Sequence, residues 1–202
     1  MKSNLIFQKE DGRVIKICNS PSEFKSELAI YRRQLPFTPQ LLDDDGRITL
    51  VLEYIEGMHI GEMPQPDFGK IAQLFAALHQ LENHHGKVIC HYDTNPRNYL
   101  FSPGKNRYFM LDFAEWRYDF PESDIIHFLL FFASIYSHRH FCEIFRQLIT
   151  AYRQTMPINP IEWDILLPEI IQRFDTRRAL FGKREQQKNP DVLHNRDFMY
   201  SL

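Results

Sequence analysis

Cysteine is scarce in this sequence, and its scarcity excludes two kinds of site. The chain has three cysteines in 202 residues, at Cys18, Cys90 and Cys142. They stand far apart, so their spacing fits neither a disulfide framework nor a cysteine-based metal site. We therefore expect reduced, buried thiols in a cytoplasmic protein.

The sequence also lacks a strong charge excess and a long hydrophobic run. The formal net charge is -2, whereas nucleic-acid binding usually requires a basic face, so no nucleic-acid partner is expected. The N-terminal residues lack the continuous apolar region of a secretory signal. The most apolar stretch, residues 125–136, contains His127 and is too short to cross a bilayer, so no membrane partner is expected. What the chain does have is 44% hydrophobic residues, enough for an extensive core.

Residues 89–101 are the most informative segment. They read Ile-Cys-His-Tyr-Asp-Thr-Asn-Pro-Arg-Asn-Tyr-Leu-Phe, a His-x-Asp-x-x-Pro-x-Asn pattern between apolar runs, and Asp112 follows downstream. Phosphoryl transfer needs a carboxylate that accepts the proton of the attacking hydroxyl, and oxygen ligands for Mg²⁺. Asp93 suits the first requirement as the catalytic residue. Asn98 and Asp112 suit the second as metal ligands.

This segment resembles the catalytic loop of the aminoglycoside phosphotransferase and choline kinase families, which usually reads His-Gly-Asp-Leu-His-Pro-Gly-Asn. Matching residues stand at His91, Asp93, Pro96 and Asn98, and the chain departs from the pattern at Tyr92, Thr94, Asn95 and Arg97. The resemblance spans roughly residues 14–131. It implies an α+β, two-lobed protein-kinase-like fold. The small antiparallel sheet lobe is expected over residues 1–56 and the larger, mainly helical lobe over residues 57–202.

The segments before the loop strengthen the resemblance. Residues 13–17 alternate like a strand and carry Lys16, and a kinase lysine in such a strand contacts the nucleotide phosphates and pairs with a glutamate on the next helix. A capping signal at Ser20, Pro21 and Glu23 predicts a helix that runs to about Leu35. We expect Glu27 to be the partner of Lys16, because Glu23 is explained as the capping acid.

Two further features are implied by the resemblance. The apolar strand that begins near Ile48 ends in Glu-Tyr-Ile-Glu-Gly, like a kinase hinge, which places backbone contacts to adenine at Glu53 and Ile55. Supporting roles fall to His91 and Asp124. Asp124 is expected to open a buried helix and to brace the catalytic loop through backbone hydrogen bonds, or to act simply as a helix N-cap.

Hydrophobic periodicity predicts the helices that surround these motifs. A helix is expected from Asp67, as N-cap, to about His84, with His79 as a structural histidine. Residues 125–136 are expected to form a central buried helix. The C-terminal third is expected to be helical, with a break between Pro157 and Pro160.

Glycine is scarce where kinases usually need it. A glycine-rich loop normally covers the nucleotide phosphates, but residues 1–12 hold a single glycine. The first lobe is therefore expected to be truncated, with the phosphates held mainly by Lys16 and the metal. Alternatively, a partner chain completes the lid.

Three functions remain open. The leading one is a phosphotransferase that uses ATP and Mg²⁺ to phosphorylate a hydroxyl of a small molecule, namely a sugar, amino sugar or amino alcohol. The second is a compact atypical protein kinase, although no Ala-Pro-Glu segment follows Asp112. The third is a nucleotide-binding pseudokinase scaffold. The missing lid favours the scaffold, and the joint presence of Lys16, Asp93, Asn98 and Asp112 opposes it.

Overall fold

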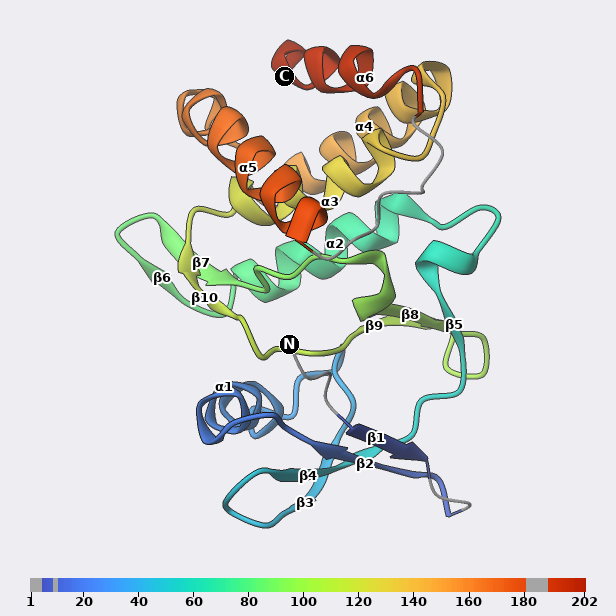
Figure 1. The fold of residues 1–202 in the computed structure, drawn as a ribbon, viewed down its shortest axis with the longest axis vertical. Helices are drawn as coiled ribbons and strands as arrows, with labels where there is room; N and C mark the ends of the chain where they lie inside the picture. The colour runs from blue at the N-terminus through green and yellow to red at the C-terminus, as the bar shows by residue number, and fades with distance from the viewer. Residues whose placement is uncertain (1–4, 9–10, 181–188) are drawn as a thin grey trace. The chain divides into compact units, whose positions relative to one another are not determined.

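The computed structural model describes residues 5–8, 11–180 and 189–202, and the chain divides into two compact units (Figure 1). The first unit contains residues 1–65 and 96–116, and the second contains residues 66–95 and 117–202. Segment 89–101 therefore begins in the second unit and ends in the first. The division of the chain into lobes at residues 56 and 57 stays a prediction.

The first unit is built on two antiparallel sheets. The larger sheet has the strand order β1-β2-β4-β3, and the smaller one has the order β5-β8-β9. The strand predicted at residues 13–17 is confirmed as β2. The strands are β1 (Leu5–Gln8), β2 (Arg13–Ile17), β3 (Leu41–Asp44), β4 (Thr49–Glu53), β5 (Met58–His59), β8 (Tyr99–Ser102) and β9 (Arg107–Met110), with short 3-10 helices η1 (Ile60–Glu62) and η2 (Pro96–Asn98).

Helix α1 (Pro21–Tyr31) packs against β4 and starts as the capping signal predicts. The Ser20 side chain accepts a hydrogen bond from the backbone N–H of Glu23, and proline occupies the first helical position. The predicted end near Leu35 is wrong, because the helix stops at Tyr31. Gln34 adopts a left-handed backbone with φ of 50°, a conformation that cannot continue an α-helix.

The second unit is mainly helical. Its helices α2 and α4 pack together, as do α3 with α5 and α4 with α6 (Figure 1). Helix α3 is almost wholly buried, which confirms a central helix, but it spans Glu122–Ala133 and not the predicted residues 125–136. The break at Pro157–Pro160 also separates two helices as predicted. The elements are α2 (Phe68–His79), β6 (Asn83–His84), β7 (Lys87–Cys90), β10 (Arg117–Asp119), α3 (Glu122–Ala133), α4 (His138–Arg153), α5 (Pro160–Leu180), α6 (Val192–Phe198) and η3 (Met199–Ser201).

Helix α2 begins as predicted but ends five residues early. The Asp67 side chain accepts a hydrogen bond from the backbone N–H of Lys70, so Asp67 is the N-cap. The helix stops at His79 instead of His84, because Asn83 and His84 pair with β7 as a hairpin strand. His85 and Gly86 form the turn with φ of 55° and 85°. Two left-handed residues are typical of a tight hairpin turn, so strand pairing overrides the helical pattern here.

The three cysteines are free and buried, as expected. The mixture of antiparallel sheets and helices confirms the α+β class. Within the described residues, no helix is both long and apolar enough to cross a membrane.

Candidate active site

Lys16 lies at the centre of a charged cluster in the first unit. Its Nζ atom is 2.5 Å from Oε1 of Glu27 and 2.8 Å from Oδ1 of Asp112. The side chains of Lys16 and Glu27 are almost fully buried, whereas 39% of the Asp112 side chain is exposed. Strand β2 and helix α1 bring the lysine and its glutamate together, and the pairing is with Glu27 rather than Glu23. Glu23 instead accepts a hydrogen bond from the backbone N–H of Asn19.

The electrostatics of this cluster keep Lys16 charged. Burial opposes the charge of its ammonium group, but Tyr31, Glu27 and Asp112 together raise the Lys16 pKa. Burial raises the pKa of Glu27 to about 7, against the opposing effect of Lys16. One ammonium group beside two carboxylates carries no net positive charge, so the cluster is suited to attract a divalent cation, and such an ion can in turn bind phosphate oxygens.

Five of the predicted site residues line one pocket of the first unit: Lys16, Glu53, Ile55, Asn98 and Asp112. The pocket has a volume of about 330 Å³, within the range of small-molecule sites. Leu52, Leu100 and Leu111 add apolar surface to its lining. Apolar and charged side chains both line the pocket, a combination that suits a nucleotide base and its phosphates.

Gly57 is required by the hinge-like segment beside this pocket. A Cβ atom on Gly57 would lie 2.2 Å from the backbone oxygen of Phe101 in β8. A side chain would therefore force the segment away from β8. The glycine of the Glu-Tyr-Ile-Glu-Gly pattern allows residues 53–57 to run close to the strand that follows Asn98.

Asp112 has a left-handed backbone with φ of 64°. Aspartate adopts this region more readily than most residues, but the conformation remains uncommon. Its backbone N–H donates to the Tyr31 hydroxyl at 3.2 Å, and the N–H of Leu111 donates to the Asn98 carbonyl at 2.8 Å. These bonds tie the two predicted metal ligands to one framework. Their carboxylate and amide oxygens are ligand types that Mg²⁺ accepts.

Asp124 organises the first half of the catalytic-loop segment in the second unit. Its Oδ2 accepts the backbone N–H of His91 at 2.7 Å, and its Oδ1 accepts that of Tyr92 at 2.8 Å. Asp124 is the third residue of α3, so it is not the helix N-cap. Burial alone would raise the pKa of Asp124. The hydrogen bond and charge of His79 outweigh this effect, together with the charge of His91 and the backbone hydrogen bond from Tyr92, so the pKa is lowered. The carboxylate forms the backbone contacts that the bracing role requires.

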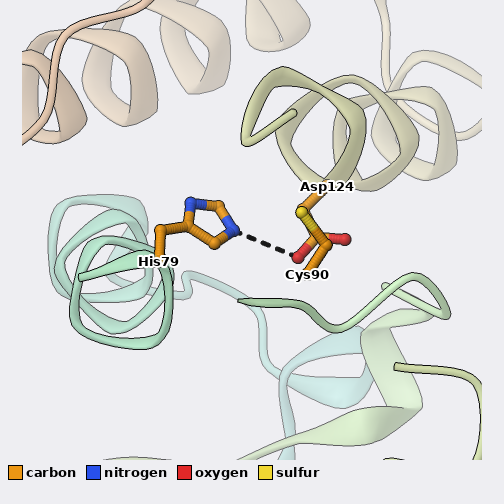
Figure 2. Close-up of side chains that lie close together, drawn as sticks. All are labelled: His79, Cys90 and Asp124. Carbon is orange, nitrogen blue, oxygen red and sulfur yellow. Dashed lines mark hydrogen bonds and ion pairs between the residues drawn. The ribbon is translucent and has the colours of Figure 1, made fainter. Parts of the chain in front are cut away.

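Figure 2 shows His79, Cys90 and Asp124 close together, with candidate ligand atoms within 4.8 Å of one another. Their chemistry does not fit a metal site. The Cys90 thiol faces the backbone oxygens of Asp119 and Phe120 as a donor at 3.5 and 3.4 Å, and burial holds its pKa well above the ordinary value. A metal would require the thiolate.

Two of these residues, His79 and Asp124, instead belong to a hydrogen-bond network. His79 Nε2 is 3.2 Å from Asp124 Oδ2, and its Nδ1 is 2.7 Å from the Tyr152 hydroxyl. A carboxylate can only accept, which assigns the Nε2 proton to the bond with Asp124. His79 is buried and structural, as predicted from the sequence.

Tyr92 occupies a position where the family usually has glycine, and its backbone is left-handed with φ of 68°. Two guanidinium groups enclose its ring. Their Cζ atoms lie 3.4 Å (Arg117) and 4.3 Å (Arg173) from the ring centroid. Arg173 Nη1 also donates to the Tyr92 hydroxyl at 2.6 Å. A left-handed backbone is unfavourable by about 1–2 kcal/mol for a residue with a Cβ, and this cation-π clamp offsets it.

Thr94, a second departure from the family pattern, is also held by the second unit. Its Oγ1 is 2.8 Å from Nδ1 of His127 on α3, and both side chains are buried. Burial lowers the pKa of His127 to about 3, with Arg173 contributing in the same direction. The ring is therefore neutral near pH 7 and acts as a fixed hydrogen-bonding group.

The predicted site residues thus fall into two groups. One group lies in the first unit: Lys16, Glu27, Glu53, Ile55, Asn98 and Asp112. The other lies in the second unit: His91, Asp93 and Asp124. Asp93 is half-buried, and its backbone N–H donates to the His91 carbonyl at 2.9 Å. The catalytic role of Asp93, the metal ligands and the adenine contacts stay predictions.

Several residues of these sites were not anticipated. Arg117, Arg173 and His127 hold the catalytic-loop segment, and His59 and Arg97 line the first-unit pocket. Tyr92 and Arg173 are 81 residues apart, and no local pattern connects them. The sequence gives one indirect indication of such a contact. Tyr92 stands where the family usually has glycine, and a bulky residue at that position needs a stabilising partner.

Comparison with known proteins supports the resemblance seen in the sequence. Residues 62–158 match the model of the phosphotransferase enzyme family. This segment includes the whole His-x-Asp-x-x-Pro-x-Asn loop, Asp112 and Asp124. The predicted resemblance to aminoglycoside phosphotransferases and choline kinases is confirmed. No curated protein is similar enough in sequence to count as a relative.

Solved structures share the fold at low sequence identity. Choline kinase from Streptococcus pneumoniae is 14% identical over 98% of this chain and 88% of that chain, with a TM-score of 0.65. An ADP-bound aminoglycoside phosphotransferase is 14% identical over 99% and 89%, with a TM-score of 0.64. A choline/ethanolamine kinase family protein from Mesorhizobium loti is 13% identical over 100% and 84%, with a TM-score of 0.63. The predicted two-lobed, kinase-like fold is confirmed.

Proposed function

We propose that this protein is a small-molecule kinase that transfers the γ-phosphate of ATP, with Mg²⁺, to a hydroxyl of a sugar, amino sugar or amino alcohol. The observation that carries the proposal is the first-unit pocket, which gathers Lys16, Asn98 and Asp112 at one site. The family match over residues 62–158 supports phosphotransferase chemistry. The small-molecule kinases that share the fold support a small acceptor, and we place the protein in the cytoplasm.

Each residue has a distinct role in this proposal. Asp112 and Asn98 bind Mg²⁺, whose charge offsets that of the phosphate oxygens. Lys16 contacts the phosphates and is held in place by Glu27. Backbone groups of Glu53 and Ile55 contact the adenine. Because both metal ligands offer oxygen and line one pocket, the donor set fits the ion.

Asp93 performs the proton transfer. Its carboxylate accepts a hydrogen bond from the acceptor hydroxyl and takes the proton as the hydroxyl oxygen bonds to the γ-phosphorus. The bond from that phosphorus to the bridging oxygen breaks, and ADP leaves. His91 and Asp124 hold the preceding backbone, since Asp124 accepts the N–H groups of His91 and Tyr92. They keep the loop in position and do not contact the reacting atoms.

The test is ATP consumption with panels of aminoglycosides, amino alcohols and sugars. We expect turnover with at least one acceptor, and we expect Asp93→Asn to lower it by about 10²- to 10⁴-fold, the usual contribution of a general base. Nucleotide affinity, measured by calorimetry, should change little. Asp164→Asn, at an exposed position of α5, is the matched control and should retain full activity. Near-normal turnover in Asp93→Asn would show that Asp93 is not the base.

A scaffold that binds nucleotide without catalysis is the second candidate, and one observation favours it. Gly12 is the single glycine in the connection between β1 and β2, so the turn directly before the Lys16 strand is not glycine-rich. A scaffold predicts Mg-ATP binding with no acceptor-dependent ATP consumption. The same panel therefore separates the two functions.

A further inference from the structure

The second unit contains a separate pocket lined by three cationic side chains. It has a volume of about 440 Å³, and its lining includes Lys87, Arg117 and Arg173. Two acidic residues also line it, Asp119 and Glu169. Arg117 already pairs with Asp119 at 2.8 Å, and Glu169 is exposed, so its charge is screened by water. With the charge of Arg117 balanced by that of Asp119, the positive charge left in the pocket comes from Lys87 and Arg173.

Arg173 is only partly satisfied within the described residues. Its Nη1 donates to the Tyr92 hydroxyl, but its Nη2 is buried and has no hydrogen-bond partner there. No carboxylate in the described part of the chain forms a salt bridge with it. A guanidinium has five N–H donors and no acceptor, so the buried Nη2 lacks a favourable hydrogen bond that an anion would supply once the side chain turned toward the pocket.

The Tyr92 ring holds both guanidinium groups in fixed positions. Arg117 and Arg173 stack on it at 3.4 and 4.3 Å from the ring centroid. Stacking restricts the side chains before any ligand binds, which lowers the entropy lost on binding. Planar guanidinium forks match the geometry of carboxylate and phosphate oxygens, and they bind both in bidentate fashion. Lys87 adds a third, point-like positive charge.

We propose that this pocket binds an oxyanion, a carboxylate or a phosphate group, carried by the acceptor molecule. The acceptor would then be an acidic hydroxy compound, such as a sugar acid or a sugar phosphate. This assignment rests on the proposed kinase function, because only a kinase has an acceptor. Asp93 follows Tyr92 directly in the chain, so an acceptor that extends from this pocket past the Tyr92 ring would present its hydroxyl to the predicted base.

Anion binding should also move Arg173. Nη2 is shielded from solvent, so an oxyanion reaches it only when the side chain turns toward the pocket. That movement changes the contact of the guanidinium with Tyr92. The Nε–H signals of Arg117 and Arg173 in NMR spectra of ¹⁵N-arginine-labelled protein therefore report on binding without nucleotide or turnover.

The first experiment titrates inorganic phosphate into the full chain at constant ionic strength, with chloride as the reference anion. We expect saturable shifts of both arginine signals, and at least about tenfold weaker binding in Arg173→Gln, because a charged hydrogen bond is lost. Arg173→Lys keeps the charge without the fork and should bind with intermediate affinity. Arg139→Gln is the matched control, since 89% of the Arg139 side chain is exposed. Unchanged arginine signals, or equal affinity in Arg173→Gln, would overturn the oxyanion site.

The second experiment identifies the source of the oxyanion. ATP consumption is compared for gluconate and glucose 6-phosphate against neutral glucose, and for other acid and neutral pairs. We expect a preference for the acidic member, and in Arg173→Gln about a tenfold greater loss of kcat/KM for the acidic member than for its neutral partner. A disturbance of the loop that Arg173 holds would lower kcat/KM for both members alike, so the difference between them reports on the anion contact. A preference for neutral acceptors, or equal effects on both classes, contradicts the acceptor assignment.

The two experiments fail in different ways. If no acceptor supports ATP consumption, the kinase function and the acidic acceptor are both wrong. The phosphate titration still decides whether the pocket is an oxyanion site, because it involves neither ATP nor transfer. Saturable phosphate binding without any preference for acidic acceptors would assign the site to free phosphate instead.

Discussion

At the scale of single residues, the catalytic-loop segment combines a common loop pattern with an uncommon residue. Tyr92 stands in a left-handed conformation with φ of 68°, where the family usually has glycine. The clamp of Arg117 and Arg173 keeps the ring in place, and Asp124 holds the Tyr92 backbone N–H. The geometry of Asp93, the next residue, therefore depends on interactions of its neighbour.

Tyr92 allows a direct test of backbone strain. Tyr92→Ala and Tyr92→Gly both remove the clamp, but only glycine adopts the left-handed region without steric strain. We expect Tyr92→Gly to be more stable than Tyr92→Ala by about 1 kcal/mol. Urea denaturation gives both free energies of unfolding.

A matched pair at Tyr118 should give the opposite order. Tyr118 lies in β10, within a strand, where glycine is less stable than alanine by about 0.5–1 kcal/mol. If Tyr92→Ala proved as stable as Tyr92→Gly, the left-handed conformation would not be a source of strain at Tyr92.

At the scale of secondary-structure elements, α3 supports the loop through two buried groups, Asp124 and His127. The folded chain holds His127 neutral, because burial lowers its pKa to about 3 from an ordinary value of 6.5. A histidine whose pKa is lowered on folding contributes stability that is fully present above the unfolded pKa. This contribution is lost as the pH falls from about 6.5 toward 3.

The lowered pKa of His127 predicts how the stability of the protein depends on pH. Between pH 6 and pH 4.5, we expect the free energy of unfolding of His127→Gln to fall less steeply than that of the wild type. The difference should approach about 1.4 kcal/mol per pH unit, the value for one proton. Urea denaturation at several pH values measures it.

Comparing slopes between variants matters because other groups titrate in the same range. Glu27, whose pKa is raised to about 7, favours the folded state as the pH falls from about 7 toward 4.5 and acts in the opposite direction. His85→Asn, at an exposed turn position, should keep the wild-type slope. Equal slopes in His127→Gln and the wild type would mean that His127 is not held neutral by folding.

Local signals explain which parts of these elements were predictable. The starts of α1 and α2 follow from capping residues Ser20 and Asp67, which act on their own neighbouring N–H groups. Their ends were mispredicted, because they depend on backbone turns and on pairing between β6 and β7. The same holds for the site. An alternating strand pattern singled out Lys16, and the position of Asp124 matched a motif of the family. Arg173, in contrast, contacts Tyr92 from 81 residues away, where no local pattern exists.

At the scale of the whole molecule, the chain contains two compact units, and the proposed nucleotide pocket is lined by residues of the first unit alone. A ligand that binds only the folded state stabilises it by RT ln(1 + [L]/Kd), about 2.7 kcal/mol at one hundred times Kd. Mg-ATP should therefore stabilise the first unit directly. The second unit gains stability only if the two unfold in one cooperative transition.

Thermal unfolding with and without Mg-ATP tests this expectation. In a single transition, we expect Tm to rise by about 5–10 °C at saturating ligand, given about 2–4 °C per kcal/mol for a chain of this size. If the two units unfold in separate transitions, only the transition of the first unit should shift to a higher temperature. Asp112→Ala should abolish the shift, since the metal-binding carboxylate is lost, and Asp164→Ala should preserve it. Asp112 also contacts Lys16, so its replacement changes the Tm of the protein without ligand. The quantity to compare between the variant and the wild type is therefore the increase in Tm that Mg-ATP causes. An equal shift in Asp112→Ala would remove Asp112 from the metal site and leave Lys16 as the main contact to the phosphates.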